Sequence, residues 1–284
     1  MPSLSAQPAT GQSFVLGLYA QALIEAYCAE GGTLEALAEA VDVSLTWLCQ
    51  LPERLSVDNY LQLIKAAHAI INDDHFGLHI GQHMHTSTFD VLGQAMLQAG
   101  NLGQATEQVL ALEGLVHTLG NSHILQEPGY IRFVWRCHYQ QHPLARALTE
   151  SVLAGIINFS QRLAGRPMPV MEVTFVHDNP QLASMAEYQR ICRSRCHFSQ
   201  AYNSILVADE VLAWPVDLSV QHTQSLFTPQ TGSSPRSLAS SAPLAHQINH
   251  HLAGVLAYGN PTLTDIARQY HMTQRTLQRR LKKE

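Results

Sequence analysis

Residues 122–140 have the sequence SHILQEPGYIRFVWRCHYQ, and this stretch decides the fold class. Apolar, β-branched and aromatic side chains run through both halves, and Pro128-Gly129 between them is a turn signal. The stretch therefore predicts two strands joined by a Pro-Gly turn. Upstream, from about Ser13 to Leu119, apolar residues recur at three- and four-residue spacing, which predicts a mostly helical segment. A helical first part followed by strands predicts an α+β domain.

The residues after the hairpin continue this mixture. PLARALTESVLAGIINFSQRLAG (143–165) predicts a long amphipathic helix that ends at Gly165. MEVTFVH (171–177) predicts a strand, LASMAEYQRIC (182–192) a helix, and CHFSQAYNSILVA (196–208) one or two further strands. The expected body is a helical first part followed by a mixed sheet with helices.

Length and composition are those of an ordinary folded protein. The chain has 284 residues, of which 46% are hydrophobic, enough for a substantial core and for two domains. The N-terminal MPSLSAQPATGQS lacks the basic and apolar regions of a signal peptide, so we expect a cytoplasmic protein without a membrane segment. The five cysteines are scattered, which favours reduced thiols over a disulfide framework.

Charge is distributed unevenly along the chain. Residues 221–243 are dominated by Ser, Thr, Gln and Pro and predict a linker between a domain at 1–220 and a segment at 244–284. The last segment has a net charge of +4, whereas the whole chain has −5, which leaves −9 for the rest. An acidic body with a small basic end is the distribution expected when only that end meets a polyanion.

The basic end has the spacing of a helix-turn-helix. In TLTDIARQYHMTQRTLQRRLKKE (262–284), Thr262 can cap a short helix and Thr273 a last helix, with a turn between them. Small or apolar residues fall where two crossing helices must pack: Ile266, Ala267, Met272, Leu277 and Leu281. The sequence therefore predicts a small all-α segment after the α+β domain.

The outward face of the last helix is suited to DNA. Arginine can donate two hydrogen bonds to guanine, glutamine can pair with adenine, and lysine can neutralise phosphate. The candidate DNA-binding residues are Thr273, Gln274, Arg275, Gln278, Arg279 and Lys282. A solvated basic helix is the alternative, but the spacing, the small alanine and the threonine cap together favour DNA.

IARQYHMTQRTLQRRLKKE resembles the first helix-turn-helix of AraC/XylS transcriptional regulators, with matches at Ala267, Thr273, Leu277, Arg279 and Leu281. The body resembles the arabinose-binding-like N-terminal domain found near the ornithine and arginine regulators. That similarity is carried by DDHFGLHIGQ, DVLGQAMLQAGNLGQATEQ and VTFVHDNPQLASMAEYQRIC with CHFSQAYNSILVADEVLAWPV. The resemblance implies a one-component bacterial regulator whose N-terminal domain binds an effector or forms a dimer.

The chain departs from the family pattern in two ways. His271 stands where the family usually has a glycine, at a turn position that tends to need positive φ. Family members also carry a second helix-turn-helix, and the sequence ends at Glu284, so we expect the DNA-binding domain to be truncated after its first motif. The alternative function is a ligand-sensing or interaction protein that has lost specific DNA binding because this domain is incomplete.

Three other motifs have plainer interpretations. TLEALAEAVDVSLTWL (33–48) aligns with 262–277 without gaps, but its last helix lacks a basic face, so a packed helical pair is favoured over a second DNA reader. His75, His79 and His83 recur at four-residue spacing, which zinc or nickel could use. Gly77 and Gly81 are expected to interrupt that helix, so a structural role is favoured and no metal is expected.

Cysteine and catalytic chemistry give weaker signals. Arg193 and Arg195 stand beside Cys192 and Cys196 in the sequence and could lower the pKa of a thiol there. A metal or redox site is not favoured. The sequence has no nucleophile elbow, no zinc-protease motif and no phosphate-binding loop, so we expect no enzyme and no cofactor. The expected partners are double-stranded promoter DNA, a small-molecule effector of unknown identity and a second copy of the chain as a homodimer.

Overall fold

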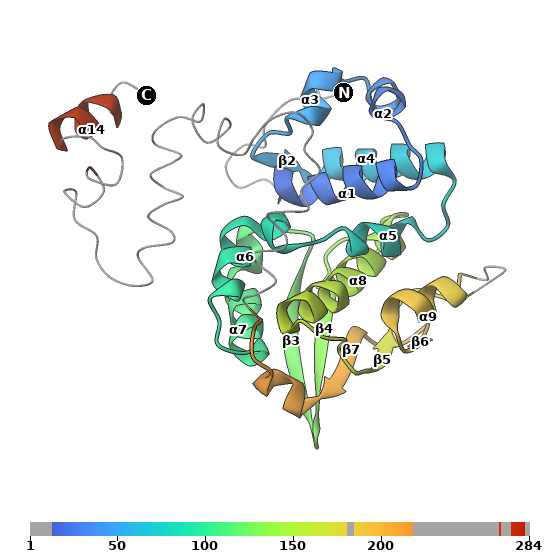
Figure 1. Cartoon of the computed structure of the whole chain (residues 1–284). Helices are drawn as coiled ribbons and strands as arrows, with labels where there is room; N and C mark the ends of the chain where they lie inside the picture. Colours follow the sequence, from blue (N-terminus) through green and yellow to red (C-terminus); the bar gives the residue numbers. More distant parts are fainter. Residues whose placement is uncertain (1–12, 181–184, 218–266, 268–273, 282–284) are drawn as a thin grey trace. The chain divides into compact units, whose positions relative to one another are not determined.

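The computed structural model describes residues 13–180, 185–217, 267 and 274–281 (Figure 1). The chain divides into two units, residues 1–220 and 221–284. The first unit is α+β, as the sequence predicts. In the second unit the described part is Ala267 and helix α14 (Gln274–Leu281).

The first part of unit 1 is mainly helical, with seven α-helices before the large sheet. Their bounds are α1 (Gly17–Ala29), α2 (Leu34–Ala40), α3 (Leu45–Cys49), α4 (Val57–Ile71), α5 (Phe76–Gln82), α6 (Asp90–Leu97) and α7 (Leu102–Leu112). Two short 3₁₀ turns belong to this part: η1 (Thr86–Phe89) lies between α5 and α6, and η2 (Glu113–Leu115) follows α7. Side-chain oxygens of Thr33, Ser44, Ser56 and Asn101 cap α2, α3, α4 and α7 at their first turns.

A small ribbon replaces the start of the helix expected from Ser13. Phe14–Leu16 forms β1, which pairs antiparallel with β2 (Arg54–Ser56). Strand pairing overrides the helical pattern here, because these three residues are buried against a distant partner and not along a helix face. Helix α1 begins at Gly17, where a Cβ atom would lie 2.2 Å from the Pro52 carbonyl oxygen, so only glycine fits.

The second part of unit 1 is a five-stranded mixed sheet in the order β3-β4-β7-β5-β6. The strands are β3 (Gly120–Glu127), β4 (Tyr130–Cys137), β5 (Val170–Thr174), β6 (Arg195–His197) and β7 (Asn203–Ala208). β5 and β6 are parallel, and the other neighbours are antiparallel. The predicted hairpin is present: β3 and β4 are joined at Pro128-Gly129, and Gly129 has φ of 77°. The turn glycine therefore adopts a conformation that other residues resist.

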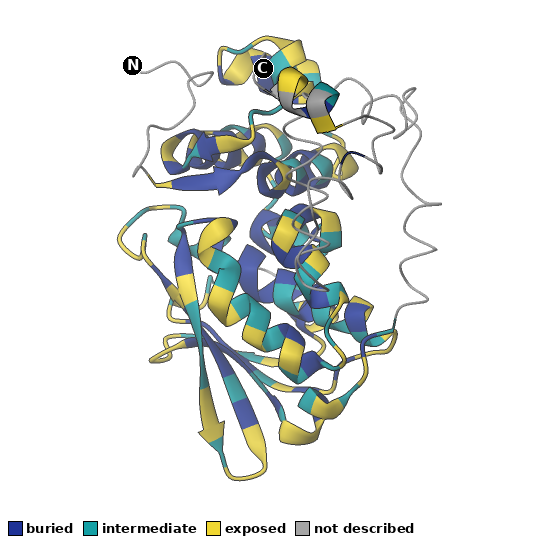
Figure 2. Ribbon diagram, turned by 90° about the vertical axis from the view of Figure 1, so that its left-hand side faces the viewer, coloured by how far each residue is buried: buried dark blue, intermediate teal, exposed yellow. Residues whose placement is uncertain are grey.

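Helix α8 (Ala145–Ala164) lies across one face of this sheet (Figure 1). It ends where the sequence predicts, at Gly165, which has φ of 62° and caps the helix in the left-handed conformation. Helix α9 (Ala186–Cys192) and the 3₁₀ turn η3 (Asp209–Ala213) complete the unit. The strands carry both buried and exposed residues (Figure 2), and Ile131, Phe133, Trp135 and Cys137, which share one face of β4, are all buried.

Helix α5 runs unbroken through Gly77 and Gly81, contrary to the interpretation that these glycines interrupt it. Both residues lie against α8. A Cβ atom at Gly81 would be 2.6 Å from the Ser151 carbonyl oxygen and from the Gly155 nitrogen. The glycines are therefore contact points at which two helix backbones approach closely, and this packing gain outweighs their poor helix propensity.

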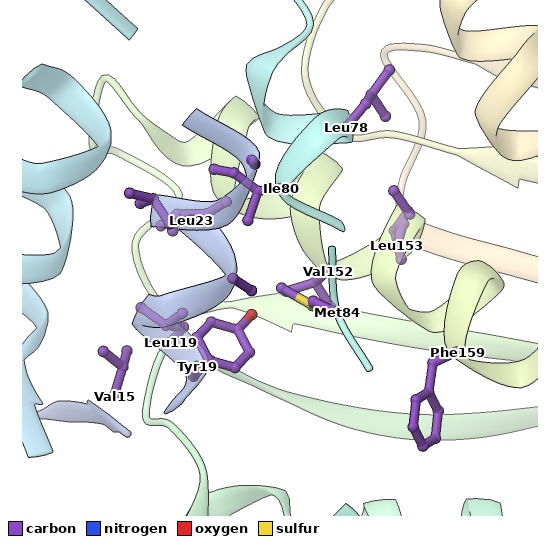
Figure 3. Packing of buried hydrophobic residues seen from close by; sticks show 14 of the residues in the cluster. Val15, Tyr19, Leu23, Leu78, Ile80, Met84, Leu119, Val152, Leu153 and Phe159 are labelled. Atoms are coloured by element: carbon purple, nitrogen blue, oxygen red, sulfur yellow. The ribbon is translucent and has the colours of Figure 1, made fainter. Parts of the chain in front are cut away.

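One continuous apolar core joins the helical part to the sheet. Figure 3 shows part of it, with Leu23 of α1 and Ile80 of α5 on one side and Leu153 of α8 on the other. All three side chains are at most 3% exposed. The helical part and the sheet thus belong to one folding unit. Among the described residues no helix is long and apolar enough to cross a membrane.

Candidate functional site

A cavity of about 120 Å³ lies between the sheet and helices α6, α7 and α8. Its floor is formed by every second side chain of β4 and β7, on the sheet face that the helices cover. These side chains include Ile131, Phe133 and Ile205. Helix α8 contributes Val152 and Phe159 to the wall. Helices α6 and α7 close the remaining sides, with residues such as Leu92, Met96, Ala105 and Val109. The lining is almost entirely apolar.

Polar groups gather around one part of this cavity. The Tyr19 and His117 rings lie 5.0 Å apart between centroids. Ser122 of β3 stands opposite Trp135 of β4, and the Ser122 hydroxyl donates to a Glu113 carboxylate oxygen at 2.7 Å. The second oxygen of Glu113 accepts from the Ser122 backbone N–H. All five residues line the cavity.

Three buried polar atoms of this cluster have no hydrogen-bond partner among the described residues: the Tyr19 hydroxyl, Nδ1 of His117 and Nε1 of Trp135. The Ser151 hydroxyl near Tyr19 donates to the Leu148 carbonyl at 2.9 Å, so toward Tyr19 it can act only as an acceptor. Figure 3 shows the Tyr19 hydroxyl directed toward Met84 and Val152, which also line the cavity. Buried polar atoms normally have partners, so such a set at a cavity indicates a place for a ligand or for water.

Burial sets the charges in this cluster. It lowers the pKa of His117 to about 4, so the imidazole is neutral at about pH 7. Burial also raises the pKa of Tyr19 and, against the hydrogen bonds from Ser122, that of Glu113. Among the described lining residues there is no Lys, Arg or Asp. The cavity is therefore a nearly uncharged space with hydrogen-bonding groups on one side.

No sequence pattern indicates this cavity. Its polar members come from α1, the segment after α7, and the hairpin, and none belongs to a motif. Ile131, Phe133 and Trp135 do alternate with more polar residues, which indicates a half-buried strand but not a hollow beneath it. The nearest sequence signal was the hairpin itself.

The predicted histidine series is a set of ion pairs centred on His79. Its Nδ1 lies 2.6 Å from an Asp73 oxygen and its Nε2 2.8 Å from a Glu187 oxygen. Burial opposes its protonation, but these two hydrogen bonds outweigh burial and raise the pKa of His79 from 6.5 to about 9. Glu30, Asp73 and His79 could together offer ligand atoms to a metal ion. A protonated His79 between carboxylates also accounts for the geometry.

The cysteine pair lies at the junction of α9 and β6. Cys192 is buried and Cys196 is half-buried, and both thiols are free. Contact with Cys196 and burial both raise the pKa of Cys192. The expectation that the neighbouring arginines lower a thiol pKa is therefore wrong for Cys192. A thiol with a raised pKa is a poor nucleophile at neutral pH.

Residues 33–48 form the packed helical pair that the sequence predicts. Leu37 and Ala38 of α2 and Leu48 of α3 are buried. At the turn between the helices, Asp42 has φ of 54°. Asp42 is the residue that aligns with His271 in the terminal motif, so this pair uses the left-handed turn that the terminal motif is expected to use.

In the terminal segment, α14 covers residues 274–281, where the sequence predicts the last helix. Ala267 and Leu277, two of the predicted packing residues, are buried. Gln274 and Arg279, two of the predicted DNA contacts, are exposed. Arg275, Gln278 and Leu281 belong to the helix. The other predicted residues lie outside the described part of the chain: Ile266, His271, Met272, Thr273 and Lys282.

Sequence comparison defines the class of protein. Residues 31–216 match the family described as the arabinose-binding domain of AraC transcription regulators, N-terminal. This match covers most of the chain and includes the described cavity-lining residues other than Tyr19. The chain therefore belongs to the AraC family of transcription regulators, which are not enzymes.

Two individual proteins are similar to this chain at low sequence identity. The chain is 25% identical over 269 residues to the ornithine utilization regulator of Pseudomonas aeruginosa, a match that covers 93% of this chain and 77% of the relative. A crystal structure of the transcriptional regulator CdpR from Pseudomonas aeruginosa is 18% identical, with a TM-score of 0.44, and covers 88% of this chain and 77% of that one.

Proposed function

We propose that the chain is a bacterial regulator that binds double-stranded promoter DNA through residues 244–284 and responds to a small-molecule effector held in the cavity of residues 1–220. Residues 221–243 link the two parts, and the protein acts in the cytoplasm, where the DNA is. The observation that carries the effector site is the group of unpartnered buried atoms at the cavity, from Tyr19, His117 and Trp135. The family match supports the regulatory role.

The DNA contacts are assigned by chemistry. Arg275 and Gln278 have side chains that can pair with base edges, and Lys282 can neutralise a phosphate. Buried Ala267 and Leu277 support the proposal, since a helix-turn-helix needs a small residue and an apolar residue where its helices cross. Exposed Arg279 supports it as well, because a reading helix must present its basic side chains to solvent.

The effector acts by shifting populations. A ligand in the cavity contacts the hairpin, α7 and α8 together, so it favours one arrangement of these elements. It changes DNA binding only to the extent that it prefers the arrangement, or the homodimer, that presents the reading helix to DNA. Ornithine, the compound in the relative's name, is a poor match to this cavity, because Glu113 is the sole carboxylate among the described lining residues and its oxygens already accept from Ser122.

The test is fluorescence anisotropy with a duplex from the promoter beside the chain's own gene, titrated at several salt concentrations. We expect Arg275→Ala and Gln278→Ala to cost about 1–3 kcal/mol on the specific duplex and to reduce sequence preference. Lys282→Ala should weaken binding to specific and random duplexes equally. Arg136→Ala, which removes an exposed arginine from β4, is the matched control and should change neither.

The result also separates the alternative function. Equal losses on specific and random DNA for all three variants would contradict the assignment of base contacts. If the chain binds no duplex even at low salt, it is instead a ligand-sensing or interaction protein without specific DNA binding.

A further inference from the structure

We infer that the effector is a small, electrically neutral and largely apolar molecule that carries one hydrogen-bond-accepting oxygen, such as a medium-chain alcohol, ketone or lactone. This inference rests on the proposed function, because it assumes that the cavity of unit 1 is the effector site. It goes beyond that proposal by fixing the chemistry of the ligand from the lining of the cavity.

The apolar body of the ligand follows from the walls. Side chains of Phe133, Phe159 and Leu92 enclose the space, and they come from the sheet, α8 and α6. Each of these three residues is at most 9% exposed, so a ligand here would exchange water for hydrocarbon on several sides. The polar lining residue Thr106 is already satisfied, because its hydroxyl donates to the Leu102 carbonyl at 2.8 Å. A ligand therefore need not accept a hydrogen bond from Thr106.

The accepting oxygen follows from the polar cluster. Nε1 of Trp135 can only donate a hydrogen bond, and it has no acceptor among the described residues. The Tyr19 hydroxyl can also donate, and the adjacent Nδ1 of His117 can donate or accept according to its tautomer. One oxygen has two lone pairs and can accept from up to two of these donors. A hydrocarbon without such an oxygen would leave them buried and unpaired.

The neutrality of the ligand follows from what the walls lack. A carboxylate needs a cation or several donors to replace its water, and the described lining offers no Lys or Arg and a neutral His117. An ammonium group needs an anion. Glu113 is the one carboxylate among the described lining residues, and each of its oxygens already accepts a hydrogen bond from Ser122, so the three N–H donors of an ammonium group would find a single, partly used partner. A carboxylate or an ammonium group would therefore lose more hydration free energy on entering the cavity than its new contacts would restore.

The size of the ligand follows from the volume. A cavity of about 120 Å³ compares with the roughly 10–15 Å³ that one water needs by the same measure, so it has room for on the order of ten non-hydrogen atoms. Octanol, octanoate and octylamine have this size and differ in the head group alone. They are therefore matched probes for the charge of the ligand.

The test is isothermal titration calorimetry of the full chain with the three probes at about pH 7. We expect octanol to bind with a dissociation constant at least about tenfold lower than octanoate or octylamine. Ala105→Phe places a ring into the cavity from α7 and should abolish binding of octanol. Ala111→Phe makes the same change at an exposed position of α7 outside the lining, and it should leave binding unchanged.

The head-group contacts are tested by variants that remove a donor and keep an aromatic ring at the position; Tyr19→Phe removes the hydroxyl alone, whereas Trp135→Phe also replaces the indole by a smaller ring. Tyr19→Phe and Trp135→Phe each remove one donor and should weaken octanol binding by about fivefold to tenfold. Tyr60→Phe is the matched control. The Tyr60 hydroxyl is also buried and unpartnered among the described residues, and its ring lies 5.8 Å from that of Tyr19, but it does not line the cavity. Its removal should leave octanol binding unchanged.

The outcomes distinguish this inference from the proposed function. If octanoate or octylamine binds as tightly as octanol and Ala105→Phe abolishes that binding, the cavity is an effector site but our ligand class is wrong. If Tyr60→Phe weakens octanol binding as much as Tyr19→Phe, the head-group assignment is wrong. If the chain binds none of the three probes, both the ligand class and the assignment of the cavity as the effector site fail. The anisotropy titration judges the DNA-binding role separately.

Discussion

Substituting Gly81 by alanine should destabilise unit 1, although alanine is the better helix former. Gly81 is buried in α5, where this helix crosses α8. A Cβ atom there would lie 2.6 Å from the Ala154 Cβ, the Gly155 nitrogen and the Ser151 carbonyl oxygen. Ordinary contact begins at 3.4 Å, so the two helices must separate by about 0.8 Å at this point. Two of the three obstructing atoms belong to the α8 backbone and cannot rotate away.

The magnitude follows from two opposing effects. Alanine gains up to about 1 kcal/mol over glycine inside a helix, because the unfolded chain loses less entropy. Overpacking a well-filled core costs about 1–3 kcal/mol, because side chains and backbone must shift. Here backbone meets backbone, so the upper half of that range applies, and we expect a net loss of about 1–2 kcal/mol. Val152 and Phe159, on the cavity side of α8, should shift with the helix.

The assay is urea denaturation followed by tryptophan fluorescence. All three tryptophans lie within residues 1–220, so the signal reports on unit 1. Gly114→Ala is the control, because a Cβ at Gly114 has no neighbour within 4 Å and its φ is not positive. That variant should be neutral within about 0.5 kcal/mol or slightly stabilising. A Gly81→Ala protein that is as stable as the wild type would refute the close approach of α5 and α8.

Two electrostatic predictions can be measured in the same way. The raised pKa of His79 means that its ion pairs with Asp73 and Glu187 stabilise the fold fully below about pH 6.5, and that this contribution is lost as the pH rises through about 9. His79→Gln should therefore destabilise unit 1 at about pH 6 and have little effect at about pH 10; an equal loss at both values would exclude a charged His79. Arg146→Ala leaves the buried carboxylate of Glu150 without the guanidinium that donates to it at 2.7 Å, and should cost about 3 kcal/mol. Because burial raises the pKa of Glu150, that loss should be smaller at low pH, where the carboxyl is protonated, and adding Glu150→Gln should recover part of it.

Much of unit 1 is determined by local sequence. The hairpin is set by Pro128-Gly129 between two apolar, β-branched segments, and the structure has it with Gly129 at positive φ. The end of α8 is set by Gly165, which adopts the left-handed cap that the sequence predicts. These signals are readable because each depends on a residue and its immediate neighbours, and glycine and proline restrict backbone dihedrals wherever they occur.

Other features were decided by partners far away in the chain. Phe14–Leu16 is a strand because Arg54–Ser56 lies beside it, although its own pattern continues that of a helix. Gly77 and Gly81 mark a helix crossing with α8 and not a break in α5, since their missing side chains are filled by another backbone. In the same way, His79 becomes part of an ion-pair cluster through Glu187, a residue of α9. A single-sequence pattern contains no information on such pairings.

The cavity shows this difference most clearly. Tyr19, His117 and Trp135 have nothing in common in the sequence, and each alone would be interpreted as a core residue. Tertiary packing brings them to one cavity, where their polar atoms have no partner among the described residues. The sequence by itself determined the family, the order of the elements from the hairpin onward and the basic terminal helix, because those follow from residue type and spacing. Only the tertiary structure decided where the space for a ligand lies, because a cavity is a property of how distant surfaces fail to fill a volume.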